Sequence, residues 1–187
     1  MNVSCWHVPS ARLFVGRKRV KHGYPLIPWL PSVVSPTGVA GGSWYSHDGA
    51  AANLLCLTMK PQYDDVVKPK YIGYLYGSEY NSVPGHHDQD VPCSVCRAPQ
   101  PTTIMVPATL TCPSGWTAQY TGHLAAGYYA HKSSSEYLCL DGEEEDVFSG
   151  NLDQNGNLIS YVVTACGSLP CPPYINDRVA TCVVCSK

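Results

Sequence analysis

Short runs rich in β-branched and aromatic residues recur along the chain, partly alternate with polar residues, and are separated by glycine and proline. This pattern is typical of strands joined by tight turns. Four runs are predicted to form strands: Tyr71–Tyr80, Thr103–Leu110, Asn157–Ala165 and Val179–Val184. Asp153–Asn157, with Asn155 and Gly156 at its centre, predicts a hairpin turn. The pattern therefore indicates an all-β fold without extended helices.

The composition agrees with this fold and narrows the function. Gly and Pro number 16 each, and 13 Tyr accompany only 2 Phe, which suits pleated surfaces and many turns. Charged residues make up 14% of the chain and the net charge is −2, so no field would attract nucleic acid. No run approaches the roughly 18 apolar residues of a membrane span. Nucleic-acid binding and a membrane span are therefore not expected.

The sequence also contains an internal repeat. Residues 37–47 align with 121–131 without a gap, sharing Thr, Gly, an aromatic and His. Leu55-Cys56-Leu57 then meets Leu138-Cys139-Leu140, and each half closes on C-x-x-C. We therefore expect two pseudo-repeated, disulfide-rich half-domains of short antiparallel strands, 37–100 and 101–187, which form one compact module. Residues 1–36 form a divergent N-terminal segment.

The chain contains ten cysteines. An even count in a Gly/Pro-rich chain of low charge predicts five disulfides and a secreted, extracellular protein. The alternative is zinc held by Cys93 and Cys96 with Cys182 and Cys185. Compact zinc ribbons separate such pairs by roughly 15–20 residues, and here most of the second half intervenes. Zinc would also leave six thiols free, so disulfides are the favoured hypothesis.

Residues 1–30 do not have the pattern of a secretory signal peptide. The basic run Arg17–Lys21 comes late, and prolines interrupt the apolar stretch that follows. Asn2 begins a glycosylation sequon, Asn2-Val3-Ser4, and is a candidate for modification.

Two imidazoles and two carboxylates occur within five residues in one segment. Side chains of these types bind divalent metals, so Ca or Zn is a candidate ligand, although no cofactor is required. The candidate ligands are His86, His87, Asp88 and Asp90. The alternative is a polar loop that leads into a strand. Glu143–Asp146 is expected to be a solvated loop, with calcium binding as the other interpretation.

Aromatic residues and histidines at equivalent repeat positions are candidates for stacking on carbohydrate. They are Trp44, Tyr45, His47, Tyr128, Tyr129 and His131. The alternative is that these rings fill a core, as aromatics in strands often do. Catalysis is not expected, because Ser114 lacks the G-x-S-x-G context of a nucleophile and an even cysteine count leaves no free thiol. We therefore expect a structural or binding protein rather than an enzyme.

From Gly38 to Lys187 the chain resembles the C-terminal non-collagenous domain of invertebrate short-chain, spongin-type collagens. The resemblance is carried by short segments spread over both halves: Gly41–His47, Tyr76–Tyr80, His87–Cys96, Cys112–Thr117, Ser168–Tyr174 and Thr181–Lys187. That family is in turn distantly similar to the non-collagenous domain of type IV collagen, which has two homologous halves. No Gly-X-Y tract is present, so a triple helix is not expected.

The resemblance implies a disulfide pairing and a function. The implied pairs are Cys112–Cys185, Cys139–Cys182, Cys166–Cys171, Cys56–Cys93 and Cys5–Cys96. The implied function is a secreted structural module of the extracellular matrix that associates with copies of itself or with other matrix proteins. The alternative is a secreted protein that binds carbohydrate or a divalent metal on the same scaffold.

Overall fold

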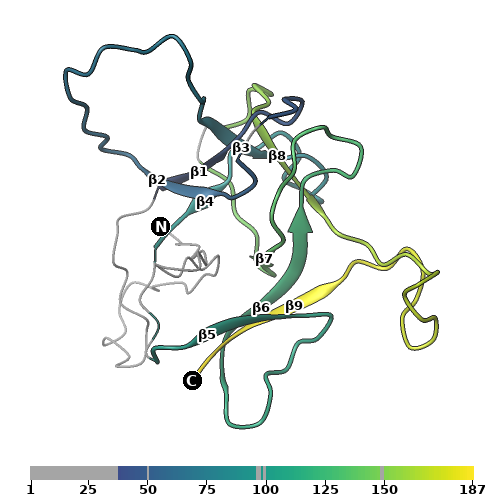
Figure 1. Cartoon of the computed structure of the whole chain (residues 1–187). Coiled ribbons are helices and arrows are strands. Elements are labelled where there is room, and N and C mark those ends of the chain that lie inside the picture. Colours follow the sequence, from purple (N-terminus) through teal and green to yellow (C-terminus); the bar gives the residue numbers. More distant parts are fainter. Residues whose placement is uncertain (1–37, 50, 96–97, 99, 148–149) are drawn as a thin grey trace.

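The computed structural model describes residues 38–49, 51–95, 98, 100–147 and 150–187. Over these residues the fold is all-β, as predicted, and forms one curled, mixed sheet with the strand order β2-β1-β3-β8-β6-β9-β5; β4 pairs with β1 and β7 with β6 (Figure 1). The strands are β1 Gly38–Gly42, β2 Leu55–Thr58, β3 Tyr76–Tyr80, β4 Pro92–Cys93, β5 Thr103–Pro107, β6 Thr117–Ala126, β7 Leu138–Asp141, β8 Asn157–Tyr161 and β9 Thr181–Ser186.

The four predicted strands are present, but each is shorter or shifted. Tyr71–Tyr80 is a strand only from Tyr76, since residues 71–75 are exposed and unpaired. The predicted hairpin at Asp153–Asn157 is wrong. The turn exists, with positive φ at Asn155 and Gly156, but no strand precedes it, and β8 leaves it to pair with β3 in parallel. That parallel pair also corrects the expectation of purely antiparallel strands.

The turn before β8 is held by a buried carboxylate from β3. Glu79 is 2% exposed, and its two oxygens accept hydrogen bonds from the backbone N–H groups of Gln154 and Asn155 at 2.9 and 3.0 Å. These bonds satisfy donors that the turn leaves unpaired, because its backbone cannot continue a ladder. The turn is therefore fixed by a contact 75 residues away in sequence, which the local pattern did not contain.

The predicted disulfides whose cysteines are described are confirmed. They are Cys56–Cys93, Cys112–Cys185, Cys139–Cys182 and Cys166–Cys171, and no described cysteine is free. The zinc alternative is therefore wrong for the described cysteines. The two cysteines of the last C-x-x-C, Cys182 and Cys185, bond to different partners. The Cys5–Cys96 pair and the sequon at Asn2 lie outside the described residues.

Two of the disulfides impose the curl of the sheet. Cys56 on β2 and Cys93 on β4 flank β1 on opposite sides, yet their Cα atoms are 5.6 Å apart. In a flat sheet, strands on either side of a third lie roughly 9.6 Å apart. Cys139 and Cys182 flank β6 in the same way, at 5.8 Å. Each disulfide therefore pulls two strands together across the strand between them.

Each of these disulfides passes over a glycine on the strand that it spans. Gly38 is paired with Cys93, and Gly122 with Cys182. A Cβ at Gly38 would lie 1.9 Å from the carbonyl oxygen of Leu57, and one at Gly122 would lie 1.6 Å from that of Leu140. The same register thus recurs around β1 and β6. The prediction of two half-domains, 37–100 and 101–187, stays a prediction for the module as a whole.

The long strand β6 lies between two buried clusters. Ala125 packs with residues of both predicted halves, including Tyr80 and Leu140, whereas its neighbour Leu124 packs with Cys139 and Val184. Successive residues of a strand point to opposite faces, so β6 contributes to both clusters. The first cluster joins residues from 40 to 159, which makes the described strands a single packed unit.

The sizes of the closed loops give a first prediction. Replacing Cys139 and Cys182 by Ala is expected to lower the free energy of unfolding by about 4 kcal/mol, because their bond closes a long loop, 43 residues apart in sequence. The matched control is the Cys166/Cys171 double Ala variant, whose partners are 5 residues apart and should cost about 2 kcal/mol. Urea denaturation measures both, and a larger loss for the control would contradict the role given to the β7–β9 bond.

A second prediction concerns Gly122, which lies on β6 beneath the Cys139–Cys182 bond. Gly122→Ala should destabilise the protein by about 3 kcal/mol or more, since its methyl group would overlap the Leu140 carbonyl in a rigid ladder. Gly77→Ala is the control: it also lies in a strand, and a Cβ there meets nothing within 4 Å. Thermal unfolding followed by circular dichroism compares the two, and equal tolerance of both substitutions would show that the close approach is not limiting.

Candidate functional site

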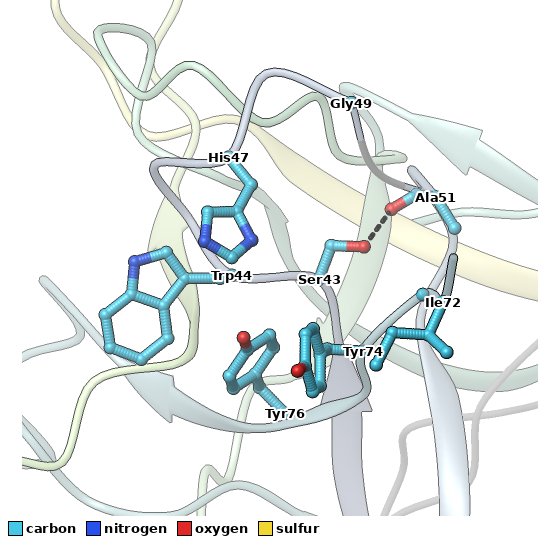
Figure 2. Close-up of a pocket in the computed structure, with 9 residues that line it drawn as sticks. Ser43, Trp44, His47, Gly49, Ala51, Ile72, Tyr74 and Tyr76 are labelled. Atoms are coloured by element: carbon cyan, nitrogen blue, oxygen red, sulfur yellow. Dashed lines mark hydrogen bonds between the residues drawn. The ribbon is translucent and has the colours of Figure 1, made fainter. Parts of the chain in front are cut away.

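A small cavity lies where the chain leaves β1. Its volume is about 310 Å³, at the lower end of ligand pockets, which span about 300–1,000 Å³. Figure 2 shows Trp44, His47, Tyr74 and Tyr76 gathered around it, with the Ser43 hydroxyl turned toward Ala51. The other lining residues are Gly49, Ala51, Ile72 and Gly73. Among these described lining residues there is no Asp, Glu, Lys or Arg, and His47 contributes an imidazole.

The loop that carries Trp44 and His47 is held by short polar contacts. The Ser43 hydroxyl donates to the Ala51 carbonyl at 2.9 Å, and the His47 backbone N–H donates to the Trp44 carbonyl at 3.1 Å. The indole N–H of Trp44 donates to the Ser46 hydroxyl at 2.8 Å. Because both ends of the loop and the ring itself are fixed, the indole face is oriented before any ligand arrives.

The rings of Trp44 and His47, in the loop after β1, contact Tyr76 at the start of β3. The Trp44 and Tyr76 centroids are 5.1 Å apart with the planes at 62°, and those of His47 and Tyr76 are 5.9 Å apart at 71°. Tyr74 lies 6.0 Å from Tyr76. Such edge-on and tilted arrangements are favourable for aromatic pairs. The contacts therefore stabilise the wall of the cavity without closing it.

The ring contacts continue outside the cavity into the second half of the chain. Trp44 lies 5.4 Å from Tyr45, Tyr45 4.7 Å from His131, and Tyr128 lies 5.2 Å from His131 and 4.6 Å from Tyr129. All six residues predicted as ligand-binding from the repeat are thus brought together. We call this continuous set of rings, from Tyr74 to Tyr129, the aromatic track.

Hydrogen bonds hold the two loops of the track side by side. The Ser133 backbone N–H donates to the Tyr45 carbonyl at 3.1 Å, and the Glu136 N–H to the Ala52 carbonyl at 2.9 Å. The Glu136 carboxylate accepts from the Leu54 N–H at 2.8 Å. The track is therefore a fixed feature of the fold, built from segments more than 80 residues apart in sequence.

The rings of the track are not core residues. Neither buried cluster contains Trp44, Tyr45, His47 or any residue from 128 to 131. Tyr128 is 42% exposed and Tyr129 is 90% exposed. The alternative that these aromatics fill a core is therefore wrong for this surface.

His131 stands in the middle of the track with one buried nitrogen. Its Nδ1 has no hydrogen-bond partner within the described part of the chain, and burial lowers the pKa of the imidazole from its ordinary value. The neutral form is favoured because a proton on a buried ring is poorly solvated. The middle of the track is therefore uncharged near neutral pH.

Sequence reasoning missed Tyr74 and Tyr76. Both fall inside the run predicted as one strand, Tyr71–Tyr80, and were treated as strand residues only. Their spacing of two residues places side chains on the same face of an extended chain, and that spacing was the available signal. What the sequence could not supply was the neighbour, since β3 pairs with the end of β1 and so lies beside Trp44.

The predicted metal ligands do not converge. His86 packs on Tyr80 with ring centroids 5.7 Å apart, and His87 faces Asp88 at 3.5 Å. Among the described residues, the group whose ligand atoms all lie within 4.8 Å is Glu79, Asp88 and Asp153. Of the four predicted ligands, it includes only Asp88. Metal binding by these residues stays a prediction.

The carboxylate group formed by Glu79, Asp88 and Asp153 already makes contacts that stabilise the fold. Glu79 already uses both oxygens to hold the turn before β8. Burial raises the pKa of Glu79, its two backbone hydrogen bonds oppose this, and the nearby Asp90 and Asp153 raise it further. Burial also raises the pKa of Asp90. The geometry is thus explained by folding alone.

Glu144 corrects the expectation of a fully solvated acidic loop. Its side chain is only 12% exposed, lies 3.1 Å from His123 Nδ1, and accepts a hydrogen bond from the Tyr161 hydroxyl. Burial raises the pKa of Tyr161, and the bond to Glu144 raises it further. Glu144 therefore links β6 to β8 as a structural acceptor.

Compared with known proteins, the chain matches no family model and no solved structure. The geometry of the cavity and the track is therefore interpreted from this chain's own residues.

The buried imidazole gives a third prediction. The pKa of His131 is lower in the folded than in the unfolded protein, so its contribution to stability is present above about pH 6.5 and is lost as the pH falls below that value. His131→Phe keeps a ring in the track and removes the proton. Its unfolding temperature should change less between pH 7 and pH 5 than that of the native protein.

The control for this prediction is His87→Phe, because His87 is exposed and lies outside the track. Its pH dependence should follow that of the native protein. A native slope that survives in His131→Phe would mean that another group titrates.

Proposed function

We propose that this protein is a secreted structural module of the extracellular matrix, without catalytic activity, that assembles with a second copy of itself. The resemblance to the non-collagenous domain of short-chain collagens supports this role. So do the disulfides, which form in oxidising compartments. In the described residues, no helix has the length and apolar character needed to cross a membrane.

The proposal is carried by one loop. Residues 59–75 connect β2 to β3 without any helix or strand and arc away from the sheet (Figure 1). Eight large apolar side chains of this loop are between 37% and 90% exposed: Met59, Tyr63, Val66, Val67, Tyr71, Ile72, Tyr74 and Leu75. Structureless loops of this length are uncommon and are usually functional. A concentrated apolar surface of this kind marks an interaction site.

We call residues 59–75 the assembly loop. Its backbone is also open to a partner. Within the described part of the chain its recorded hydrogen bonds are local, from the Lys60 N–H to Thr58 and from the Val66 N–H to Asp64. Among the residues that the structure describes, no backbone–backbone bond joins residues 59–75 to the rest of the chain. An extended segment with unpaired N–H and C=O groups is a template for pairing with another chain.

The order of residues in the loop favours a second copy as that partner. Two pairs of positions about Val67 are complementary: Tyr63 mirrors Tyr71, and Asp64 mirrors Lys70. The positions between them, 65–66 and 68–69, do not mirror each other. In an antiparallel pair of two identical loops centred on Val67, each Asp64 would therefore face a Lys70, and each Tyr63 a Tyr71. A two-fold interface requires a self-complementary surface of this kind.

The charge pattern gives the fourth prediction. The native protein should show a dimer mass by sedimentation velocity at micromolar concentration. Asp64→Lys alone, or Lys70→Asp alone, should weaken dimerisation about tenfold, because two symmetric attractions become repulsions. The double variant that exchanges the two charges should recover the native affinity, since it restores both pairs in reversed order.

The apolar contact is tested separately by Val67→Asp, which puts like charges on the symmetry axis and should give a monomer. Leu152→Asp is the control, because Leu152 is 71% exposed and lies outside the loop; it should remain a dimer. A native monomer at all accessible concentrations would overturn the proposal. Dimerisation that is insensitive to Val67→Asp would also overturn it.

A further inference from the structure

We infer that the aromatic cavity and the track beside it form a binding site for neutral carbohydrate, a ligand class beyond the self-assembly proposed above. One face of a pyranose ring carries C–H groups with slight positive charge, and its edge carries hydroxyl groups. The C–H face suits the electron-rich face of an aromatic ring. The cavity offers four rings and uncharged hydrogen-bonding groups, and both features match such a ligand.

The lack of Asp, Glu, Lys and Arg among the described lining residues selects against ionic ligands. Phosphates, sulfated sugars and acidic peptides would each need a cation to replace lost hydration. Lys132 and Asp48 form an exposed ion pair at 3.6 Å, and the Lys68 ammonium lies 5.6 Å from the centroid of the Tyr74 ring. None of these three charged residues belongs to the cavity lining. The ligand is therefore recognised by stacking and by hydroxyl groups.

Hydrogen-bonding capacity remains unused at the cavity. For the hydroxyl groups of Tyr74 and Tyr76, no hydrogen bond is recorded among the described residues, and Tyr74 is 60% exposed. The Ser43 hydroxyl donates its proton to Ala51 but keeps lone pairs that can accept. Phenol and serine hydroxyl groups thus stand beside ring faces, where they can reach the hydroxyl edge of a stacked sugar.

The site is oriented before binding. Trp44 is fixed by its bond to Ser46 and by its edge contact with Tyr76. Rigid aromatic side chains lose little conformational entropy on binding, so the stacking energy is retained as affinity. The Tyr74 end of the track is continuous with the assembly loop, and the Tyr129 end is open to solvent.

The length of the track points to a chain of sugars rather than a single residue. One unit in the cavity would stack on Trp44 and Tyr76, and the following units would run over Tyr45, His131 and Tyr128. Affinity should therefore rise with chain length up to the number of units that the track can hold, and then level off.

The test uses the full chain with neutral probes. Unsulfated gluco-, manno- and galacto-oligosaccharides of two to six units are screened on an array, and chondroitin sulfate serves as the charged comparison. Calorimetry on the best binder then gives affinities at 50 and 500 mM NaCl. We expect binding of at least one neutral series, an increase with length, and no loss at high salt, because no ion pair contributes.

Trp44→Ala should weaken binding about tenfold or more, whereas Trp44→Phe should retain part of it. Tyr129→Ala should reduce the affinity for six units but not for two, since it removes the far end of the track. Tyr137→Ala is the matched control, because Tyr137 is 63% exposed and makes no recorded ring contact with the track; it should bind as the native protein does. Peptide mapping without reduction verifies that each variant keeps its disulfides.

The proposal is overturned if no neutral oligosaccharide binds, if chondroitin sulfate binds in preference, or if Trp44→Ala binds as tightly as Tyr137→Ala. Self-assembly is measured independently on the same variants. Loss of sugar binding with an intact dimer would therefore concern the cavity alone.

Discussion

The structure depends on disulfides that cross over a strand rather than joining adjacent ones. Cys56–Cys93 spans β1, and Cys139–Cys182 spans β6, so each bond draws together two strands that a flat sheet would hold roughly twice as far apart. The sheet curls in response, and only glycine fits beneath each bond. In this curled sheet β3 and β8 meet in parallel, and one buried cluster joins residues of both predicted halves. The small charged fraction and the many turns of the chain are consistent with a fold stabilised by these covalent constraints.

Features of the fold that neighbouring residues determine can be predicted from the sequence, whereas features that distant residues determine cannot. The strands at 103–107, 157–161 and 181–186 follow from runs of β-branched residues, and the four described disulfides follow from the resemblance to short-chain collagens. The parallel pair of β3 with β8 does not follow from any local pattern, because it joins residues 79 apart. The turn before β8 was predicted as a hairpin for the same reason: Asn155-Gly156 indicates a turn, but Glu79 on a distant strand decides where the chain goes next.

In the candidate site, too, the sequence predicts some of the residues but not the contacts between them. The repeat singled out Trp44 and Tyr45 in one half and Tyr128 and His131 in the other, and the structure joins them in one track. The sequence could not show that they meet, since contact requires the second loop to dock on the first through Ser133 and Glu136. The predicted metal ligands had the opposite outcome. His86, His87, Asp88 and Asp90 are adjacent in sequence, but a turn with positive φ at Asp88 sends their side chains to different neighbours. Of the four, only Asp88 belongs to the group whose ligand atoms lie close together. Adjacency in sequence is thus a weak signal for a ligand set, whereas equivalence in a repeat was informative.

The assembly loop and the cavity share residues, so the two proposed functions are physically linked. Ile72, Gly73 and Tyr74 line the cavity and also end the loop that carries the apolar surface. Pairing the loop with a second copy would restrict the backbone of these residues, and a sugar held against Tyr74 would restrict the same segment. Two events that order one segment favour each other, and the coupling is reciprocal because it is a property of the equilibrium. If instead the paired loop drew Tyr74 away from Tyr76, the two events would oppose each other to the same degree. The geometry favours positive coupling, since Tyr74 lies at the edge of the loop, seven residues from the proposed symmetry centre at Val67, and β3 holds Tyr76 in place.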